Sequence, residues 1–183
     1  MSAEFKYPIS VQEFDKIRNG GYVYVDKTDL VYKLAQKNVC FLSRPRRFGK
    51  SLLISTLDAY FRGRKDLFEG LKMAELETEW KEYSIFHVDF ANGEYTRGVE
   101  DTRSKIEDEL QRFEERFGKS PYGDSFTSRI EYVFEQAHKQ TGRGVVVLID
   151  EYDKPMLDPI DTPLEAEHRD ILKAFYSNFK SLD

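Results

Sequence analysis

Cysteine and histidine are both scarce in this chain. It has one cysteine, Cys40, and three histidines among 183 residues, so an internal disulfide is excluded and no spacing typical of a zinc site occurs. No apolar run reaches the roughly 20 residues that a membrane-spanning helix needs. The N-terminus also lacks the basic start and apolar stretch of a signal peptide. These absences predict a cytoplasmic protein without a membrane partner. Cys40 itself is predicted to be a small core residue.

Basic residues are fewer than acidic ones. The chain has 28 Lys and Arg and 33 Asp and Glu, which gives a formal net charge of −5. This balance makes nucleic acid an unlikely partner for the domain as a whole. The content of apolar residues is 40%, and 14% of all residues are aromatic. A chain of this length and composition predicts one folded globular domain with a substantial core.

A loop that opens a helix is the most informative stretch of the sequence. Residues 39–42, Val-Cys-Phe-Leu, predict a short buried strand, and apolar residues at helical spacing across 52–61 predict a helix. Between them stands Gly49-Lys50-Ser51, in the context of a phosphate-binding loop. The unpaired N–H groups and positive dipole of a helix N-terminus attract phosphate. Lys50 would neutralise the β- and γ-phosphates, and the Ser51 hydroxyl would hold Mg²⁺.

This loop departs from the usual G-x-x-x-x-G-K-[ST] pattern, because Arg44 stands at its first position. Arginine does not freely adopt the positive φ that glycine allows, and Pro45 fixes φ and lacks an N–H. Two interpretations stay open: a phosphate-binding loop of modified shape, or a Gly-Lys-Ser that begins a helix by chance. Arg46 or Arg47 could contact the nucleotide or a neighbouring subunit's γ-phosphate, and Arg44 could join them in contacting nucleic acid.

A second stretch ends in acidic residues. Residues 145–149, Val-Val-Val-Leu-Ile, are typical of a strand buried on both faces, and Asp150 and Glu151 follow directly. Because open α/β sheets bind ligands beside the carboxyl ends of their strands, we predict that Asp150 binds Mg²⁺ or its water. Glu151 would orient or deprotonate an attacking water. The alternative is a buried strand followed by an ordinary polar turn.

The rest of the chain shows strand and helix patterns in alternation. Residues 84–90 alternate like a second strand, whose Asp89 would share the edge of Asp150 if the strands are parallel. Helical periodicity covers 99–117, 126–137 and 163–182. Two helices between two strands form a crossover, which predicts a parallel sheet.

Three segments make the sequence similar to a known family. They are Arg44-Pro45-Arg46-Arg47-Phe48-Gly49-Lys50-Ser51, Tyr24-Val25-Asp26-Lys27-Thr28 and Leu148-Ile149-Asp150-Glu151-Tyr152-Asp153. Together they resemble the predicted AAA-ATPase-like family of bacteria and archaea, over nearly the whole chain, and the unusual first loop position belongs to that family. The resemblance implies a P-loop ATPase with an additional strand and a catalytic Glu. Members commonly continue into a nuclease-like domain of the PD-(D/E)xK type.

The resemblance also implies adenine contacts in the segment before the loop, for which Tyr24, Asp26, Lys27 and Thr28 are candidates. The alternative is that Tyr24 packs in a core and Asp26 caps a helix. We predict Lys50 and Glu151 as catalytic residues, and Ser51 and Asp150 as metal ligands. The predicted nucleotide-binding residues are Arg46, Arg47, Phe48, Gly49, Lys50, Ser51, Leu52, Tyr24 and Asp26.

The predicted fold is α/β, a three-layer P-loop NTPase with a mainly parallel sheet. It forms a single domain over 1–183, with a leader over 1–38 and a nucleotide-binding core over 39–183. No strand is predicted after the acidic one, so we expect either a truncated sheet in a fragment of a longer protein or a sheet that closes differently, with a strand from another copy. An open strand edge would favour self-association. The predicted function is Mg²⁺-dependent ATP binding and hydrolysis as part of a larger protein. The alternative is a nucleotide-binding switch or interaction module that does not hydrolyse ATP.

Overall fold

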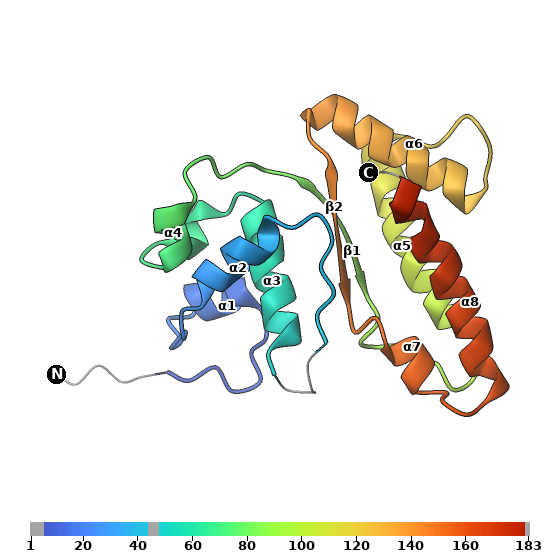
Figure 1. Ribbon diagram of the computed structural model, residues 1–183, viewed down its shortest axis with the longest axis horizontal. Helices are drawn as coiled ribbons and strands as arrows, with labels where there is room; N and C mark the ends of the chain where they lie inside the picture. The colour runs from blue at the N-terminus through green and yellow to red at the C-terminus, as the bar shows by residue number, and fades with distance from the viewer. Residues whose placement is uncertain (1–5, 44–47, 182–183) are drawn as a thin grey trace. The chain divides into compact units, whose positions relative to one another are not determined.

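The computed structural model describes residues 6–43 and 48–181 (Figure 1). The chain divides into two compact units, Met1–Tyr83 and Ser84–Asp183. The first unit contains α1 (Phe14–Asn19), α2 (Thr28–Ala35), α3 (Lys50–Phe61), the 3₁₀ helix η1 (Lys65–Phe68) and α4 (Lys72–Leu76). The second contains β1 (Ser84–Asp89), α5 (Glu100–Phe117), α6 (Phe126–Thr141), β2 (Val145–Asp150), α7 (Lys154–Leu157), α8 (Pro163–Ser177) and the 3₁₀ helix η2 (Asn178–Ser181).

Short helices pack around an aromatic core in the first unit. The rings of Phe14 in α1 and Phe68 in η1 are fully buried, with centroids 4.9 Å apart. The Arg18 side chain donates to the carbonyls of Leu67 and Glu69, each at 2.7 Å. Burial of large rings stabilises helices that are too short to persist alone, and the guanidinium fixes α1 against the end of η1.

The segment 39–42 is not a strand, so this prediction was wrong. Val39 and Phe41 are 81% and 73% exposed, and the predicted burial of Cys40 is also wrong because that side chain is exposed. A strand depends on hydrogen bonds from a neighbouring strand, and the sheet within the described residues consists of β1 and β2. An apolar, β-prone sequence therefore does not suffice to form a strand here.

The two strands of the second unit pair in parallel, as the crossover predicts. The register runs from Ser84 opposite Val145 to Asp89 opposite Asp150. Helices α5, α6 and α8 cover one face of this sheet (Figure 1), and their apolar side chains form one core cluster with Phe86 of β1. The α/β class is thereby confirmed, whereas the three-layer P-loop assignment stays a prediction.

A buried glutamate closes part of the outer edge of β1. Glu109 of α5 is buried, and its Oε1 accepts the backbone N–H of His87 at 3.0 Å. Its Oε2 accepts from Arg112 at 3.0 Å. A carboxylate that receives both a peptide N–H and a cation can be buried at tolerable cost. The side chain thus satisfies a strand donor that β2 cannot reach.

A fully buried histidine joins three segments of the second unit. His168 Nδ1 lies 2.8 Å from the Thr102 hydroxyl, and Nε2 lies 2.9 Å from the Tyr95 carbonyl oxygen. Because a carbonyl only accepts, Nε2 carries the proton and Nδ1 accepts from the hydroxyl. These bonds tie α8 to α5 and to the loop after β1.

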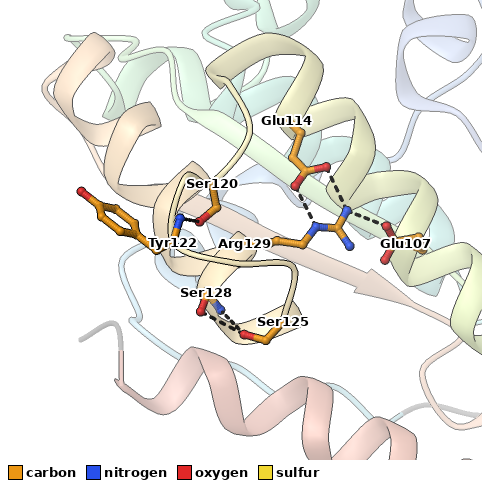
Figure 2. Close-up of polar contacts among 7 residues, drawn as sticks. All are labelled: Glu107, Glu114, Ser120, Tyr122, Ser125, Ser128 and Arg129. Carbon is orange, nitrogen blue, oxygen red and sulfur yellow. Dashed lines mark hydrogen bonds and ion pairs between the residues drawn. The ribbon is translucent and has the colours of Figure 1, made fainter.

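An arginine and two glutamates connect α5 with α6 (Figure 2). Arg129 donates through Nε and Nη2 to the two carboxylate oxygens of Glu114, at 2.7 and 2.8 Å, and through Nη2 to Glu107 at 2.5 Å. Side-chain exposure is 17% for Arg129 and 5% for Glu114. The guanidinium lowers the pKa of the Glu114 carboxyl. Glu114 and Glu107 in turn raise the pKa of Arg129.

We predict that Arg129→Met lowers the free energy of unfolding at pH 7 by about 3 kcal/mol, because it leaves the buried Glu114 carboxylate without its partner. Urea denaturation followed by circular dichroism measures this loss. The matched control is Arg169→Met, which removes an exposed ion pair with Glu165 and should cost about 0–1 kcal/mol. Equal losses in the two variants would contradict the assigned role of Arg129.

Candidate functional site

The start of α3 depends on the backbone conformation of Gly49. This residue has φ +72° and ψ +29°, in the left-handed region, and its carbonyl accepts the Leu53 N–H at 3.0 Å. A Cβ at this position would meet open space. Glycine is therefore favoured by its φ rather than by crowding, since a side chain is disfavoured in this region. The helix α3 begins directly after this left-handed residue, with Lys50 as its first residue.

The N-terminus of α3 has no capping side chain within residues 6–43 and 48–181. Its N-cap residue is Gly49, and its first turn contains no acidic residue. Lys50, Ser51 and Leu52 are half-buried, while Phe48 is exposed. Unpaired N–H groups, the positive helix dipole and the Lys50 ammonium all favour an anion at this point. Arg44, Arg46 and Arg47, which were predicted as contacts, lie outside the described residues.

Asp26 links two helices of the first unit. Its Oδ1 accepts the Thr28 N–H at 2.8 Å and the Thr28 hydroxyl at 2.7 Å, and its Oδ2 accepts the Lys72 N–H at 2.8 Å. Burial alone would raise the pKa of the Asp26 carboxyl, but these donors outweigh it and hold the pKa below its usual range. The carboxylate thus acts as a cap at the start of both α2 and α4.

The Tyr24 side chain belongs to the aromatic core of the first unit. Its ring lies edge-on to Phe14, with centroids 5.3 Å apart. Burial raises the pKa of the Tyr24 hydroxyl, and a hydrogen bond with Thr56 opposes that shift. These contacts explain the position of Tyr24 by packing.

The carboxyl ends of the two strands bring acidic residues together in the second unit. Asp89 and Asp150 are opposite one another in the parallel register. Asp150 is 8% exposed, and its Oδ1 accepts the Glu151 N–H at 2.9 Å. No hydrogen bond to its Oδ2 is found within the described parts of the chain. One oxygen is therefore held by the backbone while the other keeps its lone pairs, as a ligand of a hard cation requires.

Glu151 has an unusual backbone conformation. Its φ is +49°, in the left-handed region that non-glycine residues rarely adopt. The turn is closed by the Lys154 N–H, which donates to the Glu151 carbonyl at 3.0 Å. Strained residues of this kind concentrate at functional sites. Next to it, burial and the charge of Asp153 raise the pKa of the Tyr152 hydroxyl.

The predicted site residues thus fall into two groups. Lys50, Ser51 and Leu52 belong to the first unit with Tyr24 and Asp26, whereas Asp150 and Glu151 belong to the second. Sequence reasoning missed Lys154, whose ammonium donates to the Ala91 carbonyl. A signal was present, because a lysine in the first turn of a helix opposes the helix dipole.

Two searches of the described residues gave negative results. No group of three or more His, Cys, Asp or Glu side chains that could hold a metal ion lies within residues 6–43 and 48–181. None of the helices in the same ranges has the length and apolar character needed to cross a membrane.

Comparison with known proteins identifies the family. Residues 8–183 match the family described as Predicted AAA-ATPase. The chain belongs to this family. A relative described as an uncharacterized protein in the vnfD 5'region of Azotobacter chroococcum mcd 1 is 39% identical to this chain over 181 residues. The match covers 97% of the chain and 35% of the relative, so the chain spans about a third of that protein. No solved structure matches this chain.

We predict that Asp26→Asn lowers the thermal unfolding midpoint of this chain at pH 7, because the amide cannot accept from both Thr28 and Lys72. The folded-state pKa of Asp26 is lowered, so its stabilisation is present above the unfolded pKa of about 3.9 and disappears as pH falls through the folded value. The difference between the midpoints of wild type and variant should therefore shrink below about pH 4.

Differential scanning calorimetry from pH 7 to pH 3 measures these midpoints. Asp15→Asn, at an exposed position of α1, is the control and should change the midpoint little. A difference for Asp26→Asn that stays constant across this range would contradict the pKa assignment.

Proposed function

We propose that this chain is the nucleotide-binding domain of an ATPase, which binds ATP with Mg²⁺ and hydrolyses it in the intact protein. The observation that carries the proposal is the start of α3. A left-handed Gly49 is followed by a lysine and a serine in a helix turn that contains no acid and, within the described residues, has no capping side chain. Membership of the predicted AAA-ATPase family supports nucleotide binding and ATPase activity in general terms.

In the proposed complex, the N–H groups around residues 47–51 surround the phosphates. Lys50 offsets the charge of the β- and γ-phosphates. Arg46 and Arg47 are proposed to add charge to the same nucleotide or to a neighbouring subunit's nucleotide. Phe48 and Leu52 flank the loop, and Tyr24 and Asp26 are proposed near the adenine. The contacts of Asp26 with Thr28 and Lys72 favour an indirect role for it, through the packing of α2 and α4.

Asp150 and Ser51 are proposed to hold Mg²⁺, which when bound neutralises phosphate charge. The fit rests on the free Oδ2 of Asp150 and on a serine hydroxyl, both hard oxygen donors. Magnesium usually keeps several waters and takes few protein ligands beside phosphate, so two such oxygens suffice. Glu151 would accept a proton from, or orient, the attacking water.

The wider context also stays a proposal, since the chain spans about a third of its relative. We propose that the whole protein is cytoplasmic and self-associates. A nuclease-like domain in the same protein remains a hypothesis from the resemblance. The rival function, a nucleotide-dependent switch without hydrolysis, shares the loop and differs only in turnover. The role of Glu151 therefore decides between the two.

We predict that Lys50→Ala abolishes measurable ATP binding, a weakening of about 100-fold or more, because it removes a charge-assisted contact to the phosphates. Calorimetric titration with ATP, with and without Mg²⁺, measures the loss. Lys33→Ala, at an exposed position of α2 in the same unit, should bind like wild type. Unchanged affinity in Lys50→Ala would remove the loop from the nucleotide site.

We predict that Glu151→Gln keeps ATP affinity and loses turnover by about 10²–10⁴-fold, because the amide cannot accept a proton from water. Phosphate release by the full-length protein measures turnover, and titration measures binding. Glu167→Gln, at an exposed position of α8, serves as the control. Wild-type turnover in Glu151→Gln would exclude this residue as the base, and absence of turnover in the wild type would favour the switch.

A further inference from the structure

We propose that Lys154 is a positioning residue that ties the turn after β1 to the turn after β2 and so fixes the acidic edge of the sheet. The inference rests on the proposed function, because it assigns Lys154 to the support of the proposed magnesium site. It starts from contacts that lie wholly within the second unit.

The ends of the two strands are joined by a closed series of hydrogen bonds. The Phe90 N–H donates to the Asp150 carbonyl at 3.2 Å, which continues the sheet by one step. On the β2 side, the Lys154 N–H donates to the Glu151 carbonyl at 3.0 Å. The Lys154 ammonium then crosses to the Ala91 carbonyl. Removal of the ammonium opens this series at its only side-chain link between the two turns among the described residues.

The environment of Lys154 fits a lysine held in place. Its side chain is 26% exposed, and Nζ lies 3.8 Å from Asp158 Oδ2. The same nitrogen lies 5.7 Å from the centre of the Tyr95 ring, within the range of a cation–π contact. A carbonyl, a carboxylate and an aromatic face together compensate for partial burial of the ammonium. They also offset the unfavourable placement of a positive charge at the start of α7.

The turn after β1 is also held from its other side. The Tyr95 hydroxyl donates to the Phe90 carbonyl at 2.7 Å, and the Tyr95 carbonyl accepts from the buried His168. This core anchor does not depend on Lys154. Loss of the ammonium should therefore loosen the turn locally without unfolding the unit.

The carboxylates depend on the geometry of the two turns. The Ala91 N–H donates to Asp89 Oδ1 at 2.7 Å, and the Glu151 N–H donates to Asp150 Oδ1 at 2.9 Å. Strand pairing places the two carboxylates opposite one another, and each turn orients one of them through a backbone N–H, so the lysine that joins the turns helps to hold the orientation of Asp150. The proposed magnesium site takes Asp150 as its ligand from the sheet, so it needs a constant orientation of that carboxylate.

The test compares Lys154→Met with wild type by hydrogen–deuterium exchange, in this chain without nucleotide. Amides of residues 90–94 should exchange about tenfold faster in the variant, as expected for loss of a charge-assisted hydrogen bond. Lys139→Met removes an exposed lysine paired with Glu135 on α6 and is the matched control. Lys154→Arg keeps a charged donor and should restore slow exchange. If the Met variant does not fold, Lys154→Gln takes its place in the same comparison.

A second measurement separates positioning from a structural role. The Mg²⁺ concentration for half-maximal ATP binding should rise about tenfold in Lys154→Met, while ATP affinity without Mg²⁺ stays unchanged. Faster exchange together with an unchanged Mg²⁺ requirement would overturn the positioning role, and unchanged exchange would overturn the tether itself. A wild-type protein that binds no MgATP would instead overturn the proposed function and the positioning role with it, whereas the exchange result would still report on the tether.

Discussion

Two strands can pair in parallel only if the chain crosses back over the sheet between them. In the second unit, α5 and α6 provide this crossover and bury the face that carries Phe86. The parallel register then has a chemical consequence, because both strands end at the same edge and bring Asp89 opposite Asp150. Antiparallel pairing would have placed these carboxylates at opposite edges. This one pairing therefore determines where the acidic residues lie. It also places the turns after β1 and β2, which Lys154 joins.

The phosphate-binding candidate in the first unit has a more local origin. Its geometry follows from one glycine in the left-handed region and from a helix whose first turn lacks an acid and a capping side chain. The same unit shows the opposite arrangement at α2 and α4, where Asp26 satisfies the N–H groups of Thr28 and Lys72. A helix start that is filled by its own chain needs no ligand, and one that is left open can accept an anion.

Elements that show a local hydrophobic pattern were predicted from the sequence, whereas contacts between distant segments were not. Both strands and α3, α5, α6 and α8 were predicted, because hydrophobic periodicity reports directly which face of an element is buried. The segment 39–42 has the same apolar character but is not part of the sheet that the described residues form, and no local pattern can reveal this. The Ala91 contact of Lys154 joins segments 63 residues apart and has no local signature beyond an unfavourable charge. The roles of Lys50, Ser51, Asp150 and Glu151 follow from residue type and family, and stay predictions.

At the acidic edge of the sheet, the backbone turn at Glu151 holds one carboxylate oxygen of Asp150 in place. A left-handed residue such as Glu151 costs about 1–2 kcal/mol, and this cost is offset only if neighbouring contacts hold it. Here the Lys154 N–H closes the turn, and the Glu151 N–H itself binds Asp150 Oδ1. The backbone that is strained at Glu151 is thus the same backbone that fixes Asp150. The turn thus immobilises Asp150 Oδ1, and relaxation of the turn would loosen the strained residue and this carboxylate oxygen together.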